Sequence, residues 1–366
     1  MSAAASDEPV IIIGAGPAGL AAAESLSKRN IDYVLLEKGP SVASALRRVD
    51  PEMRLLSPTA LSVMPDMRVE STAPSYLPFK QLVHELERYK QQHGLKAIFN
   101  STVQCVQQEG DGFTVRYVSN NREHTIRGSH VINATGIISK PRLPENFVPG
   151  STTIRWMHSI DARAEQLANA QRLLVVGGGA SAAEALENWL RVRQEDSHAW
   201  LSLRSRLRAV PHWILGIDVH YFVWLPEQIP TCLFGRRVNR LTEPMTGRDV
   251  VKAIRRGLIT RMPAVRSYQE GTVEFKDGRS VQPDLIVFAT GFSYASEHLK
   301  HVVDLDPDGR PLVRNCEGTR APGVFLLGFR FGRTFASPYL RGIARDAEYV
   351  ADRIASHKKA QKAQMR

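Results

Sequence analysis

Short runs of aliphatic residues alternate with alanine-rich segments along this chain, and the alternation occurs twice in the same form. Residues 10–13 read Val-Ile-Ile-Ile and lead through a glycine-rich turn into the alanine-rich residues 20–28. Residues 173–176 read Leu-Leu-Val-Val and lead through a second such turn into residues 183–191. A short apolar run, a tight turn and a segment of helix formers are typical of a buried strand followed by a helix. The pattern therefore predicts two strand–turn–helix repeats.

Each repeat is also closed in the same way. Residues 131–136 and residues 285–291 are apolar runs that end in Ala-Thr-Gly. A pair of short stretches joined by polar turn residues precedes each closure, at 113–126 and at 272–281, and predicts a β-hairpin. Two equivalent α/β units therefore follow one another in the sequence.

One predicted strand and one predicted helix lie outside the two units. Residues 323–329 form a third apolar run, and a helical pattern follows at 339–354. The simplest place for the leftover strand is the first sheet, so the second unit is predicted to be inserted in the first domain, with the proline-rich residues 141–149 crossing between them. The predicted fold is α/β with a first domain at 8–150 and 285–356, an inserted domain at 151–284, and a basic tail at 357–366.

The first glycine-rich turn matches the pattern GxGxxG. Gly14 permits the tight turn, Gly16 lets a pyrophosphate approach the backbone, and Gly19 lets the helix pack close to the strand. The free N–H groups and the dipole of the helix N-terminus favour phosphate. The next apolar run ends in Glu37, which lies 23 residues after Gly14, close to the roughly 20 expected of a carboxylate that binds a ribose hydroxyl. This turn is predicted to bind a dinucleotide.

The second turn carries Gly177 and Gly179, with Ala182 in the third position. The apolar run that follows it, residues 199–203, ends in Arg204 instead of an acid. A guanidinium suits a 2′-phosphate, since it forms paired hydrogen bonds with phosphate oxygens, and Arg206 could add to it. The alternative is a solvated arginine-rich loop. Both units are thus predicted to be Rossmann-like, the first binding FAD and the second NADPH.

Composition narrows the function classes. Cys105, Cys232 and Cys316 lie far apart and form no CxxC pair, which argues against disulfides, a metal site and a redox dithiol. The net charge of +11 is not gathered in one stripe, so nucleic acid is not an expected partner. No apolar run is long enough to span a membrane, and the first nine residues contain no leader peptide. A cytoplasmic protein is predicted.

Aromatic residues gather at 219–234. This segment could roof a substrate channel, rest on a membrane surface, belong to the core, or form the face of a homodimer. The histidines at 158, 212, 298 and 301 are predicted to be structural or exposed. No pair of carboxylates and no nucleophile–base arrangement stands out, so the catalytic residues stay unknown at this stage.

These motifs, taken in order, resemble the class B flavin-dependent monooxygenases, which include the flavin-containing monooxygenases and the YUCCA-like enzymes. The resemblance covers nearly the whole chain. Its motifs are GAGPAG at 14–19, ATG with trailing prolines at 134–144, GGGASAAE at 177–184, LRSRLRAVPHWILG at 203–216, FATGF at 288–292, VFLLGF at 324–329 and RDAEYVADRI at 345–354.

The resemblance implies two sets of cofactor-binding residues. For FAD they are Gly14, Gly16, Pro17, Ala18, Gly19, Glu37, Lys38, Leu46, Ser57, Val103, Ala134, Thr135, Gly136, Gly328 and Phe329. For NADPH they are Gly177, Gly179, Ala180, Ser181, Arg204, Ser205, Arg206, Thr290 and Gly291. It also implies that one oxygen atom of O2 enters a small apolar organic substrate at nitrogen, sulfur or a carbonyl, through a C4a-(hydro)peroxyflavin.

Two other functions stay open. The family's FxGxxxH fingerprint ends here at His158, but Thr152 and Ile154 stand in place of its Phe and Gly. An NADPH-dependent flavoprotein reductase or oxidase without a stable peroxyflavin is therefore an alternative. A non-catalytic FAD-binding sensor is the other, although such a protein would need no NADPH pocket.

Overall fold

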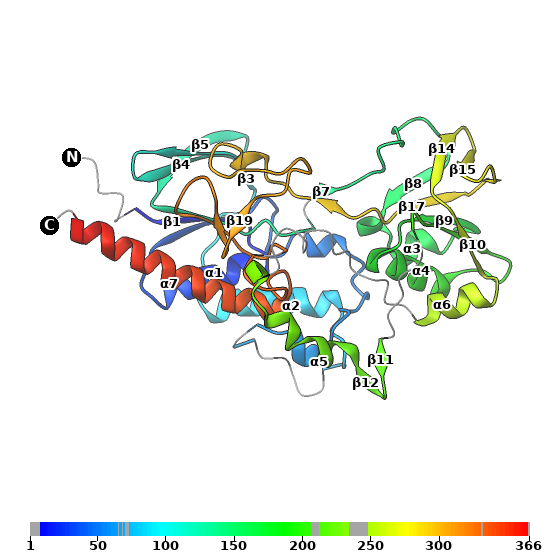
Figure 1. Cartoon of the computed structure of the whole chain (residues 1–366), viewed down its shortest axis with the longest axis horizontal. Coiled ribbons are helices and arrows are strands. Elements are labelled where there is room, and N and C mark those ends of the chain that lie inside the picture. Colours follow the sequence, from blue (N-terminus) through cyan, green and yellow to red (C-terminus); the bar gives the residue numbers. More distant parts are fainter. Residues whose placement is uncertain are drawn as a thin grey trace.

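The computed structural model describes residues 8–364, apart from 65, 68, 70–72, 139, 206–211, 234–247 and 331. Two α/β bodies lie side by side along the longest axis of the molecule (Figure 1). The first contains both ends of the described chain, and the second is built from residues in the middle of the sequence. The fold class predicted from the sequence is confirmed by this arrangement.

The first body is built on a six-stranded sheet in the order β19-β20-β21-β6-β1-β2. The strands β1, β2, β6 and β21 are parallel to one another, and β19 and β20 form an antiparallel edge. Their bounds are β1 Val10–Ile13, β2 Tyr33–Leu36, β6 His130–Asn133, β19 Val313–Arg314, β20 Glu317–Gly318 and β21 Val324–Leu326. The strands β1, β6 and β21 are wholly buried, which explains why they read as unbroken apolar runs, and β2 is buried over its second half.

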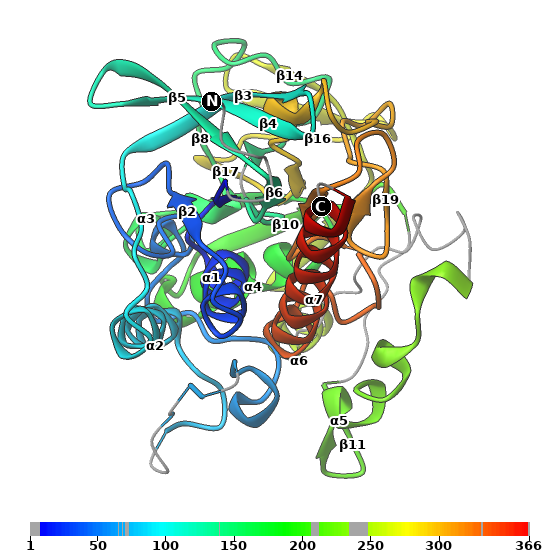
Figure 2. The same ribbon diagram turned by 90° about the vertical axis from the view of Figure 1, so that its left-hand side faces the viewer.

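Helices and a small sheet cover the two faces of this first sheet. On one face lie α1 (Pro17–Ser27), α2 (Phe79–Gln92) and α7 (Leu340–Gln364), and Figure 2 shows α1 and α7 running next to each other. The other face is covered by the antiparallel strands β3 (Ser101–Glu109), β4 (Gly112–Ser119) and β5 (Arg122–Gly128). The predicted hairpin at 113–126 is confirmed by β4 and β5.

The second body has a five-stranded parallel sheet in the order β13-β10-β9-β17-β8. Its strands are β8 Arg155–His158, β9 Arg172–Val176, β10 His198–Ser202, β13 Ile259–Met262 and β17 Leu285–Phe288. The helices α3 (Ala164–Leu167), α4 (Ala180–Val192) and α6 (Arg248–Arg255) pack on one face around the buried Trp189. Strands β14 (Val265–Gln269), β15 (Thr272–Phe275) and β16 (Ser280–Val281) pack on the other and confirm the hairpin predicted at 272–281.

Two of the segments in which the chain passes between the bodies pair with each other. Strand β7 (Lys140–Pro141) is antiparallel to β18 (Phe292–Ser293), with Pro141 opposite Phe292. Beyond the crossings, the Arg48 guanidinium donates to both Asp161 carboxylate oxygens at 2.9 and 3.0 Å. Asp50, which is buried, accepts a hydrogen bond from the main-chain N–H of Ala164 at 2.9 Å. These contacts fix the two bodies against each other.

One predicted boundary is wrong. The first domain was expected to resume at residue 285, but β17 pairs with β8 and β9 and belongs to the inserted sheet. The return to the first body therefore comes after β17, at the β18 crossing. The repeat pattern places residues 285–291 at the close of the second unit, so the strand pairing agrees with the repeat and contradicts only the domain boundary.

A second correction concerns the aromatic segment, which was expected within the inserted unit. The residues from β11 (Trp213–Ile214) through β12 (Ile217–Asp218), α5 (Val219–Val223) and the following 3-10 turns, Pro226–Gln228 and Thr231–Leu233, reach back to the first body. There the main-chain N–H of Thr231 donates to the Arg333 carbonyl at 3.0 Å, and that of Ala336 donates to the Glu227 carbonyl at 3.0 Å. The other 3-10 turns in the described part of the chain are Leu46–Arg48, Thr59–Leu61, Ser159–Asp161 and Glu297–Leu299.

The basic tail is also not a separate segment. Helix α7 continues through residue 364, so residues 357–364 form its last turns. Lys358 donates through Nζ to the Glu8 carbonyl at 2.8 Å and ties this end of the helix to the start of β1. Within the described residues, none of the helices combines the length and the apolar character required to cross a membrane.

Candidate cofactor cavity

A cavity of about 1100 Å³ opens at the carboxyl edge of the first sheet. The loops that follow β1, β2, β6 and β21 all line it, because the carboxyl ends of parallel strands meet at one edge. Helix α7 contributes its first residues, and α5 closes another side. Ala180 and Glu184 of α4 also line the cavity, so the inserted body reaches it as well.

The glycine-rich turn after β1 has the geometry that the sequence motif requires. Gly14 has φ +103°, and a Cβ there would lie 2.7 Å from the carbonyl oxygen of Ala134. A Cβ on Gly19 would lie 1.8 Å from the Gly14 carbonyl oxygen, so only glycine allows α1 to pack this closely. Gly16 differs from both, because a Cβ there would meet no protein atom within 4 Å. This open space lies on the cavity in front of the N-terminus of α1, where an anion is favoured.

Glu37 is held beneath this turn. Its Oε2 accepts a hydrogen bond from the Ala15 main-chain N–H at 2.7 Å, and its Oε1 accepts one from Gly39 at 2.7 Å. Each carboxylate oxygen can accept a further hydrogen bond, and Glu37 lines the cavity. The carboxylate is thus fixed in one position at the edge of the cavity.

Most of the residues predicted to bind FAD lie on this one cavity. They are Gly14, Gly16, Pro17, Ala18, Glu37, Lys38, Leu46, Ser57, Val103, Ala134, Thr135, Gly136 and Gly328. Gly19 lies behind the turn, where it serves the helix packing described above. Phe329 does not line the cavity, since its side chain is buried in the core and stacks on Tyr294 with 5.5 Å between ring centroids, and its role in binding stays a prediction.

The second glycine-rich turn repeats part of this geometry. Gly177 has φ +138°, and a Cβ there would lie 2.1 Å from the Ala289 carbonyl oxygen. Gly179 is the N-cap of α4, whose first residues are Ala180 and Ser181. Only Ala180 of these lies on the large cavity.

The other residues predicted to bind NADPH lie in two places. Ser205 lines a separate hollow of about 580 Å³ at the carboxyl ends of β10 and β13, and Arg204 beside it is exposed. Thr290 donates through Oγ1 to the Arg142 carbonyl, and the Gly291 carbonyl accepts a hydrogen bond from His158 Nε2 at 2.9 Å, so both belong to the crossing between the bodies. Arg206 lies outside the described residues.

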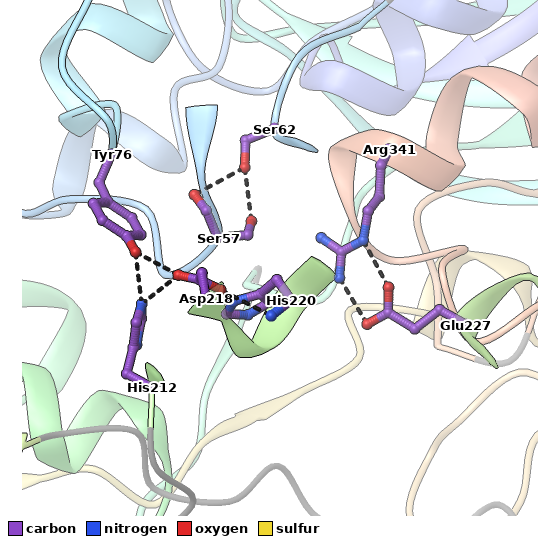
Figure 3. Close-up of polar contacts among 8 residues, drawn as sticks. All are labelled: Ser57, Ser62, Tyr76, His212, Asp218, His220, Glu227 and Arg341. Atoms are coloured by element: carbon purple, nitrogen blue, oxygen red, sulfur yellow. Dashed lines mark hydrogen bonds and ion pairs between the residues drawn. The ribbon is translucent and has the colours of Figure 1, made fainter. Parts of the chain in front are cut away.

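At the α5 side of the cavity a carboxylate collects three hydrogen bonds (Figure 3). Asp218 is buried and accepts from the Tyr76 hydroxyl, and from His220 through Nδ1 at 2.7 Å and its main-chain N–H at 2.8 Å. His212 Nε2 lies 2.9 Å from the Asp218 oxygen that Tyr76 contacts and hydrogen-bonds with the Tyr76 hydroxyl at 3.2 Å. Burial opposes ionisation of this group, but the hydrogen bonds from Tyr76 and His220 outweigh it and hold the pKa of Asp218 below its ordinary value. Burial, together with Asp218, raises the pKa of Tyr76. His220 faces the cavity.

Sequence reasoning missed this cluster, apart from naming His212 as structural. Asp218 and His220 come from one short segment, but Tyr76 lies 142 residues away from Asp218. A local signal does exist, since an aspartate at the N-cap of a helix two residues before a histidine can bond both that residue's main chain and its ring. Nothing in the sequence pairs it with Tyr76.

Two further polar contacts border the cavity (Figure 3). The hydroxyl oxygens of Ser57 and Ser62 lie 2.7 Å apart. Arg341, at the start of α7, makes two hydrogen bonds of 2.7 Å to the Glu227 carboxylate, and both side chains are largely buried. This ion pair joins the 3-10 turn after α5 to the first body.

Two groups of side chains bring three potential metal-ligand atoms within 4.8 Å of one another in the described part of the chain. They are His212, Asp218 and His220, and Glu24, Asp66 and His93. In the first group, Nδ1 and the main-chain N–H of His220 bond to Asp218, and His212 Nε2 hydrogen-bonds with the Tyr76 hydroxyl at 3.2 Å. In the second, Glu24 already pairs with Lys28 at 2.5 Å, and Asp66 is exposed. We therefore assign no metal ligands, and the expectation of no metal stays a prediction.

Comparison with known proteins places these features in context. The sequence profile of the family described as pyridine nucleotide-disulphide oxidoreductase matches residues 11–196. An uncharacterised CzcO-like oxidoreductase of Geobacillus kaustophilus is 26% identical, over 95% of this chain and 98% of its own. The indole-3-pyruvate monooxygenase YUCCA4 of Oryza sativa is 26% identical, over 94% of this chain and 86% of its own.

Solved structures show the same fold. A flavin-containing monooxygenase from Stenotrophomonas maltophilia superposes with a TM-score of 0.75 at 23% identity, covering 96% of this chain and 98% of its own. The bacillithiol disulfide reductase of Bacillus cereus gives a TM-score of 0.74 at 21% identity, covering 96% and 99%. The comparisons confirm the resemblance stated from the motifs.

Proposed function

The chain belongs to the pyridine nucleotide-disulphide oxidoreductase family, and from this premise we propose that it is an FAD- and NADPH-dependent monooxygenase. It would place one oxygen atom of O2 in a small, largely apolar organic substrate. One observation carries the proposal: a single cavity is lined both by the turn after β1 and by the first residues of α4. Two nucleotide-binding units that share one cavity can bring a nicotinamide to a flavin.

The residues present fit FAD. The open space at Gly16 leaves room for a pyrophosphate, and Glu37 is fixed where it can accept from a ribose hydroxyl. FAD, when bound, supplies the electron transfer and the oxygen activation. The chain's own residues bind and orient it, and the apolar Leu46, Leu55 and Val223 on the cavity wall exclude water from it.

The proposal that NADPH is the electron donor rests on Arg204. This exposed guanidinium stands at the end of the second strand of the inserted unit, the position from which a 2′-phosphate is bound. The peroxyflavin route that the resemblance implies stays a prediction. So do the assignment to nitrogen, sulfur or carbonyl oxidation and the cytoplasmic location.

The aromatic segment supports a role next to the substrate. Val219, His220 and Val223 of α5 line the cavity, whereas Tyr221, Phe222 and the hairpin tip at Leu215 are exposed on the outer side. The inner side would roof the substrate site. The outer side has the exposed apolar surface that either a homodimer or a peripheral membrane contact would use, and both stay predictions.

A flavoprotein reductase or oxidase is the second candidate. The departures at Thr152 and Ile154 from the monooxygenase fingerprint favour it, and a disulfide reductase shares the fold. The chain has no CxxC pair, so a dithiol-based mechanism is not available to it.

Product analysis separates these functions. The protein reconstituted with FAD is mixed with NADPH, O2 and, in turn, an aromatic sulfide, an amine and a ketone, and oxygenated product and hydrogen peroxide are both measured. A monooxygenase gives product that matches the NADPH consumed. Peroxide in the same amount as NADPH, with no product from any substrate, identifies an oxidase. Failure to retain FAD, or a flavin that NADPH does not reduce, contradicts both functions.

A further inference from the structure

His220 is positioned by its own segment. Asp218 is the N-cap of α5 and accepts from the His220 main-chain N–H at 2.8 Å, which brings the ring of His220 back onto the same carboxylate. Nδ1 then lies 2.7 Å from Asp218 Oδ1. An ionised carboxylate only accepts hydrogen bonds, so Nδ1 carries the proton and Nε2 has a free lone pair. Within the described residues, hydrogen bonds engage Nδ1 and the main chain of His220, and none engages Nε2.

The surroundings of Asp218 keep this arrangement stable. Its carboxylate is buried. The Tyr76 hydroxyl donates to Oδ2, the oxygen that His220 does not contact, and His212 Nε2 lies 2.9 Å from the same oxygen. A buried carboxylate beside an imidazole fixes its tautomer and stabilises the imidazolium formed when Nε2 takes a proton. Tyr76 and His212 act on the carboxylate, so their role is to position it.

The other ionisable groups on this side of the cavity differ from His220. Glu227 is paired with Arg341 through two hydrogen bonds. Tyr221, the next residue of α5, is half exposed on the outer surface. Glu184 enters from α4 on the inserted body. His220 is thus the cavity-lining group that combines a fixed tautomer with a buried counter-charge.

We propose that His220 Nε2 is the proton acceptor for an amine substrate that enters the cavity as an ammonium ion. An N–H bond of the ammonium breaks, an Nε2–H bond forms, and the amine nitrogen regains the lone pair that it needs to accept an oxygen atom. The imidazolium later returns its proton to water. The inference rests on the proposed function for the oxygenation that follows, but the proton transfer itself needs no oxidant.

The test compares an amine with a neutral sulfide of similar size. Benzylamine is protonated at neutral pH, whereas thioanisole has no proton to lose. The variant His220→Asn removes Nε2, while its amide can keep the bond to Asp218. We expect it to weaken benzylamine binding to the oxidised flavoprotein by about tenfold or more, as for a hydrogen bond to a charged group. Thioanisole binding should stay within about twofold.

Turnover gives the second measurement. Loss of a proton acceptor lowers the rate by about 10²-fold or more, so oxygenation of benzylamine should fall by this factor in His220→Asn while that of thioanisole changes little. The substitution Asp218→Asn should also lower the amine rate, because it removes the carboxylate that fixes the tautomer. In the wild type this rate should fall with decreasing pH. His301→Gln, at an exposed histidine outside the cavity, is the matched control. FAD content and melting temperature verify folding, and His220→Gln replaces any variant that does not fold.

The outcomes separate this inference from the proposed function. Benzylamine binding that depends on His220, without oxygenated product from either compound, supports the inference and contradicts the monooxygenase. Equal losses with benzylamine and thioanisole, no loss with either, or no benzylamine binding by the wild type would overturn the role of His220.

Discussion

Gly14 and Gly16 stand two residues apart in one turn, but an added methyl group would meet opposite surroundings at the two positions. At Gly14 it would lie 2.7 Å from the Ala134 carbonyl oxygen, on a backbone with φ +103°. At Gly16 it would meet no protein atom within 4 Å, on a backbone with φ −81° that any residue adopts. Alanine at Gly14 should therefore damage the fold, and alanine at Gly16 should damage only the binding of FAD.

The magnitudes follow from these contacts. A left-handed backbone costs a residue with a Cβ about 1–3 kcal/mol, and crowding against a main-chain carbonyl adds about 1–3 kcal/mol. Gly14→Ala should thus lower the free energy of unfolding of the FAD-free protein by about 2–6 kcal/mol. Gly16→Ala should change it by less than about 0.5 kcal/mol. Its methyl group fills the approach of the pyrophosphate, so FAD affinity should fall at least about tenfold, or about 1.4 kcal/mol.

The assay uses the FAD-free proteins, with denaturant unfolding followed by circular dichroism and FAD binding followed by fluorescence quenching. Gly278→Ala is the matched control for strain alone, because Gly278 has φ +86° in a hairpin turn with nothing within 4 Å of an added Cβ. A Gly16→Ala protein that binds FAD as tightly as the wild type would refute the reasoning. So would a Gly14→Ala protein no less stable than Gly278→Ala.

Three further expectations concern other parts of the molecule. Arg204→Ala should raise the KM for NADPH by about tenfold and that for NADH little, because only NADPH carries the 2′-phosphate; equal effects in steady-state assays would remove Arg204 from the site. Arg341→Met should lower the free energy of unfolding by about 3 kcal/mol, because it leaves the Glu227 carboxylate buried without its partner. Adding Glu227→Gln should restore part of the lost stability. A double variant that is less stable than Arg341→Met in denaturant titrations argues against this explanation. Burial, the largest cause, lowers the pKa of His130 to about 3 and of His298 to about 4, from an ordinary 6.5. Below about pH 6.5 the unfolded chain binds protons at these two histidines that the folded chain does not bind, so the free energy of unfolding is highest above about pH 6.5 and falls as the pH drops toward 4. His298→Gln should therefore lose less stability than the wild type between pH 7.5 and 5. Equal losses in the two proteins would contradict the assignment.

The parallel strands and the glycine-rich turns could be predicted from the sequence because their causes are local. A strand buried on both faces appears as an unbroken apolar run, as at β1 and β9. A turn without room for a Cβ requires glycine, as at Gly14 and Gly177. Such features depend on neighbours in the sequence or on the backbone alone.

The rest depended on contacts between distant residues. The Ala-Thr-Gly closure of the second repeat agrees with β17 in the inserted sheet, but no local pattern marks where the chain returns to the first body, so the predicted domain boundary falls too early. The end of α7 is predicted from the sequence to be a separate basic tail, but its residues form helices readily and Lys358 anchors them. The segment from β11 through the 3-10 turn Pro226–Gln228 has no clear period, and its position follows from bonds to Tyr76 and to Arg341 of α7.

The pairing of β7 with β18 bears on how such a two-body chain arises. Because Pro141 stands opposite Phe292 in an antiparallel ladder, the two ends of the inserted body meet side by side. A two-residue hairpin turn has the reach to join them directly. In topological terms the whole inserted body is one very long loop of its host, and gene rearrangement could add or exchange it without breaking a hydrogen bond of the host sheet.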